Sequence, residues 1–469
     1  MNRLLRSCAV WTLTAATAGG MAPLRAFATA AAPARSVASA PSTTAALKIA
    51  PVAYRERRLA NGLQVISVRS EASPTVSVQV WYHVGSRNDP AGRSGFAHLF
   101  EHLMFKGTRY LRPEQFDRLT EDIGGSNNAF TSNDVTVYYE VVPSNHLETL
   151  LWAEEERMQN LKIDDANFRS ERAVVEEEYR QSVLAVPYGR FTHAVQSLPY
   201  LQHPYRRATI GSIADLDAAT VTDVTAFHAL HYRPDNATLV VAGDFDPASL
   251  DTWVDQYFAP IARPSAPIAP LDATEPPWPS DRTIALKAPR VPLPATAVIW
   301  LAPPLRSGDA PALQVAAAIL SQGDSSRLNQ SLVYRQQIAS SASFDADLRD
   351  GPGLLAATAV AAGGKPIAEI RKALLAEVQR LADHPPSAAE LDKVKTQLIT
   401  AAFVSRQTPE GLGMEIASAA VLEGDAGRIN ADLEALQRVS AADVQRVLRR
   451  YVTGTHDVVI DYSQETSAP

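Results

Sequence analysis

The sequence predicts an α+β fold made of two similar α/β-sandwich domains, each with a mixed or antiparallel sheet covered by helices. Three observations support this prediction. Strand-like and helix-like runs follow one another without the regular alternation of a doubly wound parallel sheet. The chain has 469 residues, which is more than a single hydrophobic core usually reaches, about 250–300 residues. An order of strand, turn and apolar helix also occurs once in each half.

The first half contains two runs rich in β-branched and aromatic residues, 61–68 and 75–84, which we expect to form adjacent antiparallel strands. The repeated unit is strand 75–84, a turn and a helix, and its counterpart is strand 296–301 with the apolar helix 312–320. The other elements that we expect in the first half are helices at 113–123, 146–159 and 165–183, a glycine-rich turn at 124–128, and strands at 135–142 and 237–242.

A proline-rich stretch separates the two halves. Prolines recur through residues 260–279, and at this density they prevent both helix and central strand. The stretch is therefore predicted to be an extended linker, although a structured loop packed across both domains would have the same composition. The expected organisation is a signal peptide at 1–28, a disordered leader at 29–50, an N-terminal domain at 51–259, a linker at 260–282 and a C-terminal domain at 283–465.

The first residues follow the pattern of an export signal. Arg3 and Arg6 precede a short apolar run at 8–17 and an Ala-Phe-Ala stretch at 26–28, as in cleaved signal peptides. The apolar run is too short to cross a bilayer, so we expect an exported protein, periplasmic in a bacterium. Because the only cysteine, Cys8, lies inside this signal, the mature chain is predicted to have no disulfide and no cysteine ligand for a metal.

The charge of the chain argues against one class of partner. The formal net charge is -7 and the sequence pI is about 5.8, so the basic footprint of a nucleic-acid-binding protein is missing. Charged residues of both signs are interspersed along the sequence, and they indicate no other partner.

Residues 96–108, FAHLFEHLMFKGT, carry the clearest chemical signal. His98, Glu101 and His102 form an H-x-x-E-H arrangement, the inverse of the H-E-x-x-H motif of other metalloproteases. On a helix, residues three and four apart share a face, so both imidazoles and the carboxylate can converge. Two imidazoles suit a zinc ion, and a carboxylate beside them suits a base that activates water. The alternative is an amphipathic helix with histidines hydrogen-bonded in a core.

A zinc ion held by two histidines needs at least one more protein ligand. Residues 170–180, SERAVVEEEYR, offer several glutamates. If this segment is helical, Glu171 and Glu178 share a face with its two valines, whereas Glu176 falls on the opposite face and Glu177 on the flank. A carboxylate on an apolar face is costly unless it is paired or metal-bound, so Glu171 and Glu178 are both candidates. The alternative is a solvated run of charges.

HLFEHLMFKGT together with the later ERAVVEEE resembles motifs of the pitrilysin/insulinase metallopeptidases. The closest resemblance is to their shorter class, which includes the mitochondrial processing peptidase and many bacterial exported peptidases. Similar stretches are GGSNNAFTSNDVTVYYEVV from Gly124, LVVAGDFDP near Gly243 and GDSSRL near Arg327, so the likeness covers about Arg58 to Tyr462. It implies a LuxS/MPP-like metallohydrolase fold, in which two similar domains form half of a clamshell.

The resemblance also implies roles for the residues above. His98, His102 and Glu178 match the ligands of one zinc ion per chain, and Glu101 matches the base that activates water. Glu171, seven residues before Glu178, matches a carboxylate that assists catalysis by orienting a histidine or the base.

The substrate is implied in the same way. Asn128, Ala129 and Phe130 match an edge strand that pairs with the backbone of a bound peptide, which is β-augmentation. The implied activity is that of a zinc-dependent metalloendopeptidase, which cleaves peptides or unfolded segments in a chamber closed by a second subunit.

One departure from the family concerns partners. Self-sufficient members carry in the second domain an Arg and, seven residues later, a Tyr that contact the substrate carbonyl. Aligning Arg327 with its family counterpart places Val333 and Ser340 at these positions, and neither side chain can replace the donors. Tyr334 has the right spacing from Arg327, but Arg327 already fits the preceding motif.

We therefore expect the zinc-bearing subunit of a heterodimer, in which a sister subunit of the same family supplies the missing pair; a homodimer is the alternative. Two other functions remain as alternatives. A non-enzymatic assembly subunit of the same fold would have no need of a full ligand set with its base, and a zinc-dependent hydrolase of another small substrate rests on the bare motif alone.

Overall fold

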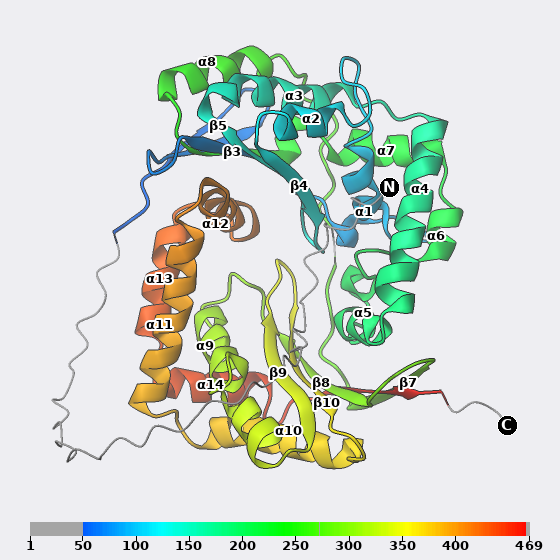
Figure 1. The fold of residues 1–469 in the computed structure, drawn as a ribbon, viewed down its shortest axis with the longest axis vertical. Helices are drawn as coiled ribbons and strands as arrows, with labels where there is room; N and C mark the ends of the chain where they lie inside the picture. The colour runs from blue at the N-terminus through cyan, green and yellow to red at the C-terminus, as the bar shows by residue number, and fades with distance from the viewer. Residues whose placement is uncertain (1–49, 272, 466–469) are drawn as a thin grey trace, which may run out of the picture. The chain divides into compact units, whose positions relative to one another are not determined.

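The computed structural model describes residues 50–271 and 273–465 (Figure 1). The predicted signal peptide and all but the last residue of the predicted leader lie outside these residues. Within the described ranges, the helices are too short or too polar to cross a membrane.

Six strands form the first sheet, in the order β1-β2-β6-β3-β5-β4. Neighbouring strands are antiparallel except for β2 and β6, which are parallel. The strands are β1 (Arg55–Arg58), β2 (Gln64–Arg69), β3 (Thr75–Tyr82), β4 (Ser126–Thr131), β5 (Thr136–Pro143) and β6 (Ala237–Gly243).

The prediction that β2 and β3 are adjacent is wrong. Strand β6 lies between them, parallel to β2 and antiparallel to β3. Every residue of β6 is buried, and a mostly apolar strand of this kind gains most from a central position covered on both faces. The short distance in sequence between β2 and β3 suggested a hairpin, but β6, which is far away in sequence, lies between them.

The helices of the first half include the motif helix α1, which ends at Leu103, and α4, which runs into a π-helical segment, η3. The set is α1 (Phe96–Leu103), α2 (Gln115–Glu121), α3 (Leu147–Asn160), α4 (Asp165–Tyr179), α5 (Gly189–Ser197), α6 (Ile213–Asp217), α7 (Val221–His231) and α8 (Pro247–Tyr257), with the short segments η1 (Ser86–Asn88), η2 (Ser144–His146), η3 (Arg180–Ala185), η4 (Pro204–Arg206) and η5 (Pro234–Asn236).

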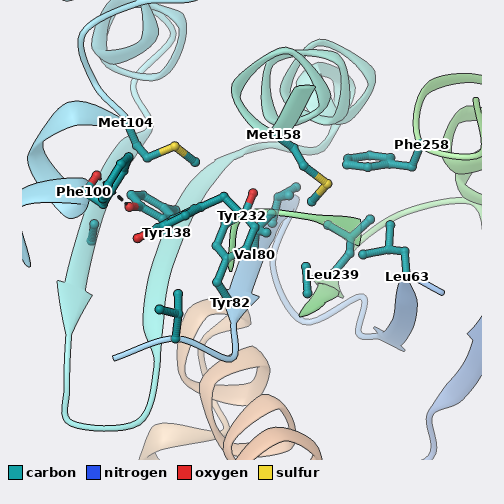
Figure 2. Close-up of a cluster of buried hydrophobic side chains, with 14 of the residues drawn as sticks. Leu63, Val80, Tyr82, Phe100, Met104, Tyr138, Met158, Tyr232, Leu239 and Phe258 are labelled. Carbon is teal, nitrogen blue, oxygen red and sulfur yellow. Dashed lines mark hydrogen bonds between the residues drawn. The ribbon is translucent and has the colours of Figure 1, made fainter. Parts of the chain in front are cut away.

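One face of the first sheet is covered by α1, α3, α7 and α8. Alternate residues of β3 and β5, such as Val80 and Tyr138, meet Phe100 of α1 and Met158 of α3 in a continuous apolar core (Figure 2). Full burial of one such apolar side chain contributes about 1.5–3 kcal/mol. The packing of α1 against this sheet therefore fixes the helix that carries the metal-binding motif.

The second sheet has the order β7-β11-β8-β10-β9, with only β7 and β11 parallel within it. The strands and helices of this half are β7 (Arg282–Ala288), β8 (Ala295–Ala302), α9 (Ala310–Ser321), η6 (Asn329–Arg335), β9 (Ala339–Asp347), β10 (Gly353–Ala361), α10 (Ile367–Asp383), α11 (Ala388–Ser405), α12 (Pro409–Leu422), α13 (Arg428–Arg438), α14 (Ala441–Tyr451) and β11 (Val458–Gln464). Two mixed sheets with helices confirm the α+β prediction, and β3–α1 and β8–α9 confirm the repeated order.

Each sheet also receives a helix from the other half of the chain. Helix α12 packs on the face of the first sheet opposite α1, in a cluster that includes Trp81, Val137, Val240 and Ile416. Helix α5 contributes Phe191 to the core of the second sheet. The two halves are thus tied together by an exchange of helices that no sequence pattern indicated.

The proline-rich stretch is a structured loop and not a free linker. Trp278 is buried against the second sheet, and the Glu275 carboxylate accepts three backbone N–H bonds, from Leu201, Gln202 and His203, at 2.7–3.0 Å. Near its start, Arg233 donates to the carbonyls of Pro264 and Ala266 at 3.1 and 2.9 Å. Of the two alternatives left by the sequence, the structure favours the packed loop.

Candidate metal centre

The N-terminus of α1 is held by a buried carboxylate. The first N–H groups of a helix have no intrahelical partner, and here Asp89 accepts the N–H of Gly95 at 2.7 Å and of Ala97 at 2.9 Å. Burial raises the pKa of Asp89 to about 7, although these backbone bonds oppose the rise. Gly95 has φ +94° and passes so close to the Ile210 carbonyl that a Cβ would lie 2.8 Å from its oxygen.

The last turn of α1 is held from the sheet. The Tyr138 hydroxyl donates to the Phe100 carbonyl at 3.0 Å (Figure 2), and this carbonyl also accepts the N–H of Met104 at 3.1 Å. The Phe100 ring stacks on Phe227 of α7, with centroids 5.4 Å apart. Both ends of the motif helix are therefore fixed before any ligand binds.

Helices α1 and α4 lie side by side (Figure 1), and together they bring His98, His102 and Glu178 into one cluster. Glu178 Oε2 lies 3.8 Å from His98 Nε2 and 3.4 Å from His102 Nε2. The candidate ligand atoms of the three side chains all lie within 4.8 Å of one another. Of the other glutamates of this segment, Glu171 lies beside His102, whereas Glu176 pairs with Arg172 and Arg180.

This arrangement fits a zinc ion. Ligands held at 2.0–2.1 Å in a tetrahedron lie about 3.4 Å apart, which is close to the separations between Glu178 and the two imidazoles. The rings of His98 and His102 are 5.0 Å apart and nearly perpendicular, so their nitrogens approach one point from different directions. Three protein ligands are the number that catalytic zinc sites use, with one position left for water.

The charges of the site also favour a cation. Burial opposes a charge on His102, but Glu171 and Glu178 outweigh burial and raise its pKa to about 9. His98 is more strongly affected by burial, which lowers its pKa despite Glu101 and Glu178. Burial would raise the pKa of Glu171, yet His102 and Lys106 lower it below its ordinary value. The carboxylates beside His102 therefore favour positive charge at this place, as a metal ion would bring.

Glu101 lies on α1 between the two histidines and is almost completely buried. Its charge acts on both imidazoles, since it opposes the fall in the pKa of His98 and adds to the rise in that of His102. A carboxylate in this position can take a proton from water that attacks a bound substrate.

Asn128, Ala129 and Phe130 lie in β4, the last strand of the first sheet. Ser132 N–H bonds to the Val135 carbonyl at 2.8 Å in the β4–β5 turn. Along an antiparallel strand, residues that bond to the neighbouring strand alternate with residues that do not. Because Ser132 bonds across to Val135, Asn127, Ala129 and Thr131 direct their main-chain groups to the outer edge of the sheet. Ala129 N–H is met there by the Asn128 side-chain oxygen at 2.8 Å.

The second half holds no Arg–Tyr pair at the expected positions. Val333 lies in η6 and Ser340 in β9, where its hydroxyl donates to the Val360 carbonyl at 3.3 Å. Arg327 makes two bonds to Glu390, at 2.8 and 2.7 Å, which gives this arginine a structural role. Tyr334, the residue with the right spacing, is exposed.

Three residues around the site were not singled out in the sequence. Asp89 and Tyr138 hold the two ends of α1, and Lys106 contacts Glu171 at 2.9 Å. Lys106 stands within FKGT, directly after the motif, so its position was a usable signal. Asp89 and Tyr138 reach α1 only through the fold, and a single sequence gave no sign of them.

Two family models match the chain. "Insulinase (Peptidase family M16)" matches residues 64–210, which include His98, Glu101, His102 and Glu178. "Peptidase M16 inactive domain" matches residues 218–398. The motif-bearing part of the chain and the part without it are thus matched by different models.

The chain is similar in sequence to a named zinc protease and to a named subunit of a processing peptidase. It is 33% identical over 343 residues to the "Zinc protease PqqE" of Helicobacter pylori. The aligned residues cover 72% of this chain and 76% of that protein. It is 25% identical to a "Probable mitochondrial-processing peptidase subunit beta" of Arabidopsis thaliana, over 85% of this chain and 76% of that protein.

Solved structures share the fold. A protease from Helicobacter pylori superposes with a TM-score of 0.85 at 27% identity, covering 88% of this chain and 100% of that one. The periplasmic protease PqqL of Escherichia coli gives a TM-score of 0.72 at 18% identity, over 88% of this chain and 48% of that chain.

Proposed function

Since this chain belongs to the M16 (insulinase) family of peptidases, we propose that it is a zinc-dependent metalloendopeptidase that cleaves peptides or unfolded segments. The observation that carries the proposal is the convergence of His98, His102 and Glu178 from two helices, with Glu101 on the same helix as the histidines. A non-enzymatic assembly subunit has no use for a full ligand set with a base beside it.

Each side chain has a defined task in this proposal. His98, His102 and Glu178 would hold one zinc ion per chain, which would supply Lewis acidity toward the scissile carbonyl. Glu101 takes a proton from the attacking water and delivers it to the leaving amine. Glu171 faces His102 Nδ1 at 3.7 Å and keeps this imidazole oriented.

The outer edge of β4 is the proposed binding site for the peptide substrate. Asn127, Ala129 and Thr131 offer main-chain donors and acceptors there, and an extended peptide can add as a further strand. Before a peptide can bond to Ala129, the Asn128 side-chain oxygen must release the hydrogen bond that it accepts from the Ala129 N–H. Half-buried Asn128 and Phe130 would contact substrate side chains, inside a chamber closed by a second subunit.

We further propose that the chain is active in a heterodimer. Val333 has no side-chain donor, and the short Ser340 hydroxyl lacks the reach of a tyrosine toward the oxyanion that develops during peptide hydrolysis. One lost donor typically costs about 100- to 1000-fold in rate. A sister subunit of the same family would supply the pair, and one relative is itself named as a subunit, of a processing peptidase. A homodimer is the alternative. The similarity to a periplasmic protease supports a periplasmic location.

The experiment is peptide cleavage by Glu101→Gln, with metal content measured on the same sample. The protein is purified as the full chain with any subunit that accompanies it, and is assayed on unstructured fluorogenic peptides. We expect Glu101→Gln to keep its zinc and lose at least about 100-fold in kcat/KM, while Glu177→Gln, an exposed glutamate of α4, cleaves like the wild type. Unchanged cleavage by Glu101→Gln would contradict the mechanism.

The partner is tested separately, with the single chain free of other subunits. We expect it to bind zinc and cleave poorly, with activity restored by the co-purifying subunit. Strong turnover by the pure single chain would refute the heterodimer and leave the zinc peptidase proposal intact.

A further inference from the structure

Lys106 lies against the candidate metal centre although it is outside the H-x-x-E-H motif. Its ammonium nitrogen is 2.9 Å from Glu171 Oε1, and the side chains of Lys106 and Glu171 are 26% and 5% exposed. An ion pair with one nearly buried partner is screened far less than a surface pair. Lys106 therefore has more influence on Glu171 than an exposed lysine would have.

The two oxygens of Glu171 face different groups. Oε1 meets the Lys106 ammonium and accepts the Ser170 hydroxyl at 3.2 Å. Oε2 faces His102 Nδ1 at 3.7 Å, an ion-pair distance rather than a hydrogen-bond distance. With one oxygen held by two donors, rotation of the carboxylate is restricted, and the other oxygen stays directed at the imidazole.

The same imidazole faces the metal position with its other nitrogen. His102 Nε2 is 3.4 Å from Glu178 Oε2, so Lys106, Glu171, His102 and the ligand set form one continuous series of contacts. Carboxylates that hold a metal-binding histidine fix its tautomer and its direction, and their loss typically costs about 10- to 100-fold in metal affinity. The series extends this influence one residue further, to Lys106.

Backbone contacts fix where Lys106 lies. The chain turns directly after α1, with Phe105 N–H bonded to the His102 carbonyl at 3.1 Å and Lys106 N–H to that of Leu103 at 3.0 Å. Gly107 then adopts φ +106°, and a Cβ there would lie 2.8 Å from the Leu111 carbonyl oxygen. Lys106 is thus presented to α4 by the turn that follows the helix carrying the histidines.

We propose that Lys106 is a positioning residue that holds Glu171 so that its free oxygen orients His102, and that Lys106 thereby sets the affinity of the centre for zinc. This inference rests on the proposed zinc site. A merely structural role, in which the Lys106–Glu171 pair ties α1 to α4, would change the stability of the metal-free protein and leave zinc affinity unaltered.

The test is a competition titration of the full chain with zinc and a chelating indicator, with the melting temperature of the metal-free protein measured alongside. We expect Lys106→Met to weaken zinc binding by about 10- to 100-fold. Lys106→Arg, which keeps the charge, should retain most of the affinity. Lys162→Met is the matched control, because Lys162 is an exposed lysine, 3.3 Å from Asp164, and should bind zinc like the wild type.

A double-mutant cycle tests whether Lys106 acts through Glu171. If it does, Lys106→Met lowers zinc affinity much less in a Glu171→Gln background than in the wild type. Lys106→Gln is the second variant, for use if Lys106→Met does not fold. Wild-type zinc affinity in Lys106→Met or Lys106→Gln, or equal losses in both backgrounds of the cycle, would overturn the inference. Failure of the wild type itself to bind zinc would instead reject the proposed function.

Discussion

The helices α1 and α9 occupy the same place in the two halves of the chain, yet only α1 is equipped for chemistry. Each follows a central strand of its sheet and is largely buried. Helix α9, APALQVAAAILS, buries only alanine, valine, leucine and isoleucine, whereas α1 also buries His98 and Glu101. A buried polar group without a partner costs about 1–3 kcal/mol in proteins, and His98 Nδ1 has no hydrogen-bond partner among the described residues.

The difference shows how one repeated unit separates stability from function. In the second half, α9 contributes only apolar packing. In the first half, α1 has polar groups in place of part of that packing, and a cation can satisfy them. Contacts from outside the helix hold α1 at both ends, with Asp89 at its first turn and Tyr138 at its last. The predictions below are ordered from the largest expected effect to the smallest.

The largest effect is expected when α1 is made to resemble α9. We predict that His98→Leu abolishes zinc binding and at the same time stabilises the metal-free protein by about 1–3 kcal/mol, because an unpartnered buried nitrogen is removed. Zinc titration and chemical denaturation of the metal-free chain measure the two results. His146→Leu, outside the site, should leave zinc binding unchanged. If metal-free His98→Leu is less stable than the wild type, the polar residues of α1 do not cost the protein stability, and the contrast with α9 is wrong.

The second prediction equips the second half with the donors that it lacks. The double substitution Val333→Arg, Ser340→Tyr is expected to raise kcat/KM of the single chain on the order of 100-fold, because two donors reach the developing oxyanion. Ser340 is exposed, so a tyrosine can be accommodated there. Steady-state kinetics of the double variant against each single one provides the measurement. No gain in the double variant would mean that the two positions do not face the substrate.

The smallest effect concerns the exchanged helix α12. A Cβ at Gly413 would lie 2.4 Å from the Gln79 side-chain nitrogen, and Gln79 is itself buried and donates to the Glu410 carbonyl at 2.9 Å. We predict that Gly413→Ala lowers the free energy of unfolding by about 1–3 kcal/mol. Gly363→Ala, with open space around its Cβ, should change it by less than about 0.5 kcal/mol. Equal denaturation midpoints for the two variants would argue against tight docking of α12.

The sequence predicted local features well because they depend on periodicity and spacing. Helical phase placed Glu171 and Glu178 on one face of the predicted helix, and in the structure both lie beside His102. The repeated strand, turn and helix identified the two halves. Pairing between distant segments could not be derived in this way. The central position of β6 and the docking of α12 depend on complementary surfaces that meet only after folding.

The same limit applies to the support of the site. Lys106 stands next to the motif, but its contact with Glu171 depends on how α4 passes α1. The Tyr138 bond to Phe100 depends on the order of strands in the sheet, where the sequence-based pairing of β2 and β3 was wrong. Residues that bind can be predicted from their type and spacing, whereas residues that position them become visible only in the fold.

The most direct test of the metal centre is the zinc content of the purified full chain and of two variants of α4. We predict about one zinc ion per chain in the wild type and in Glu176→Gln, and loss of that ion in Glu178→Gln, because only Glu178 faces the two imidazoles. Zinc retained at the wild-type level in Glu178→Gln, or a wild type that binds no zinc when it is supplied, would contradict the account.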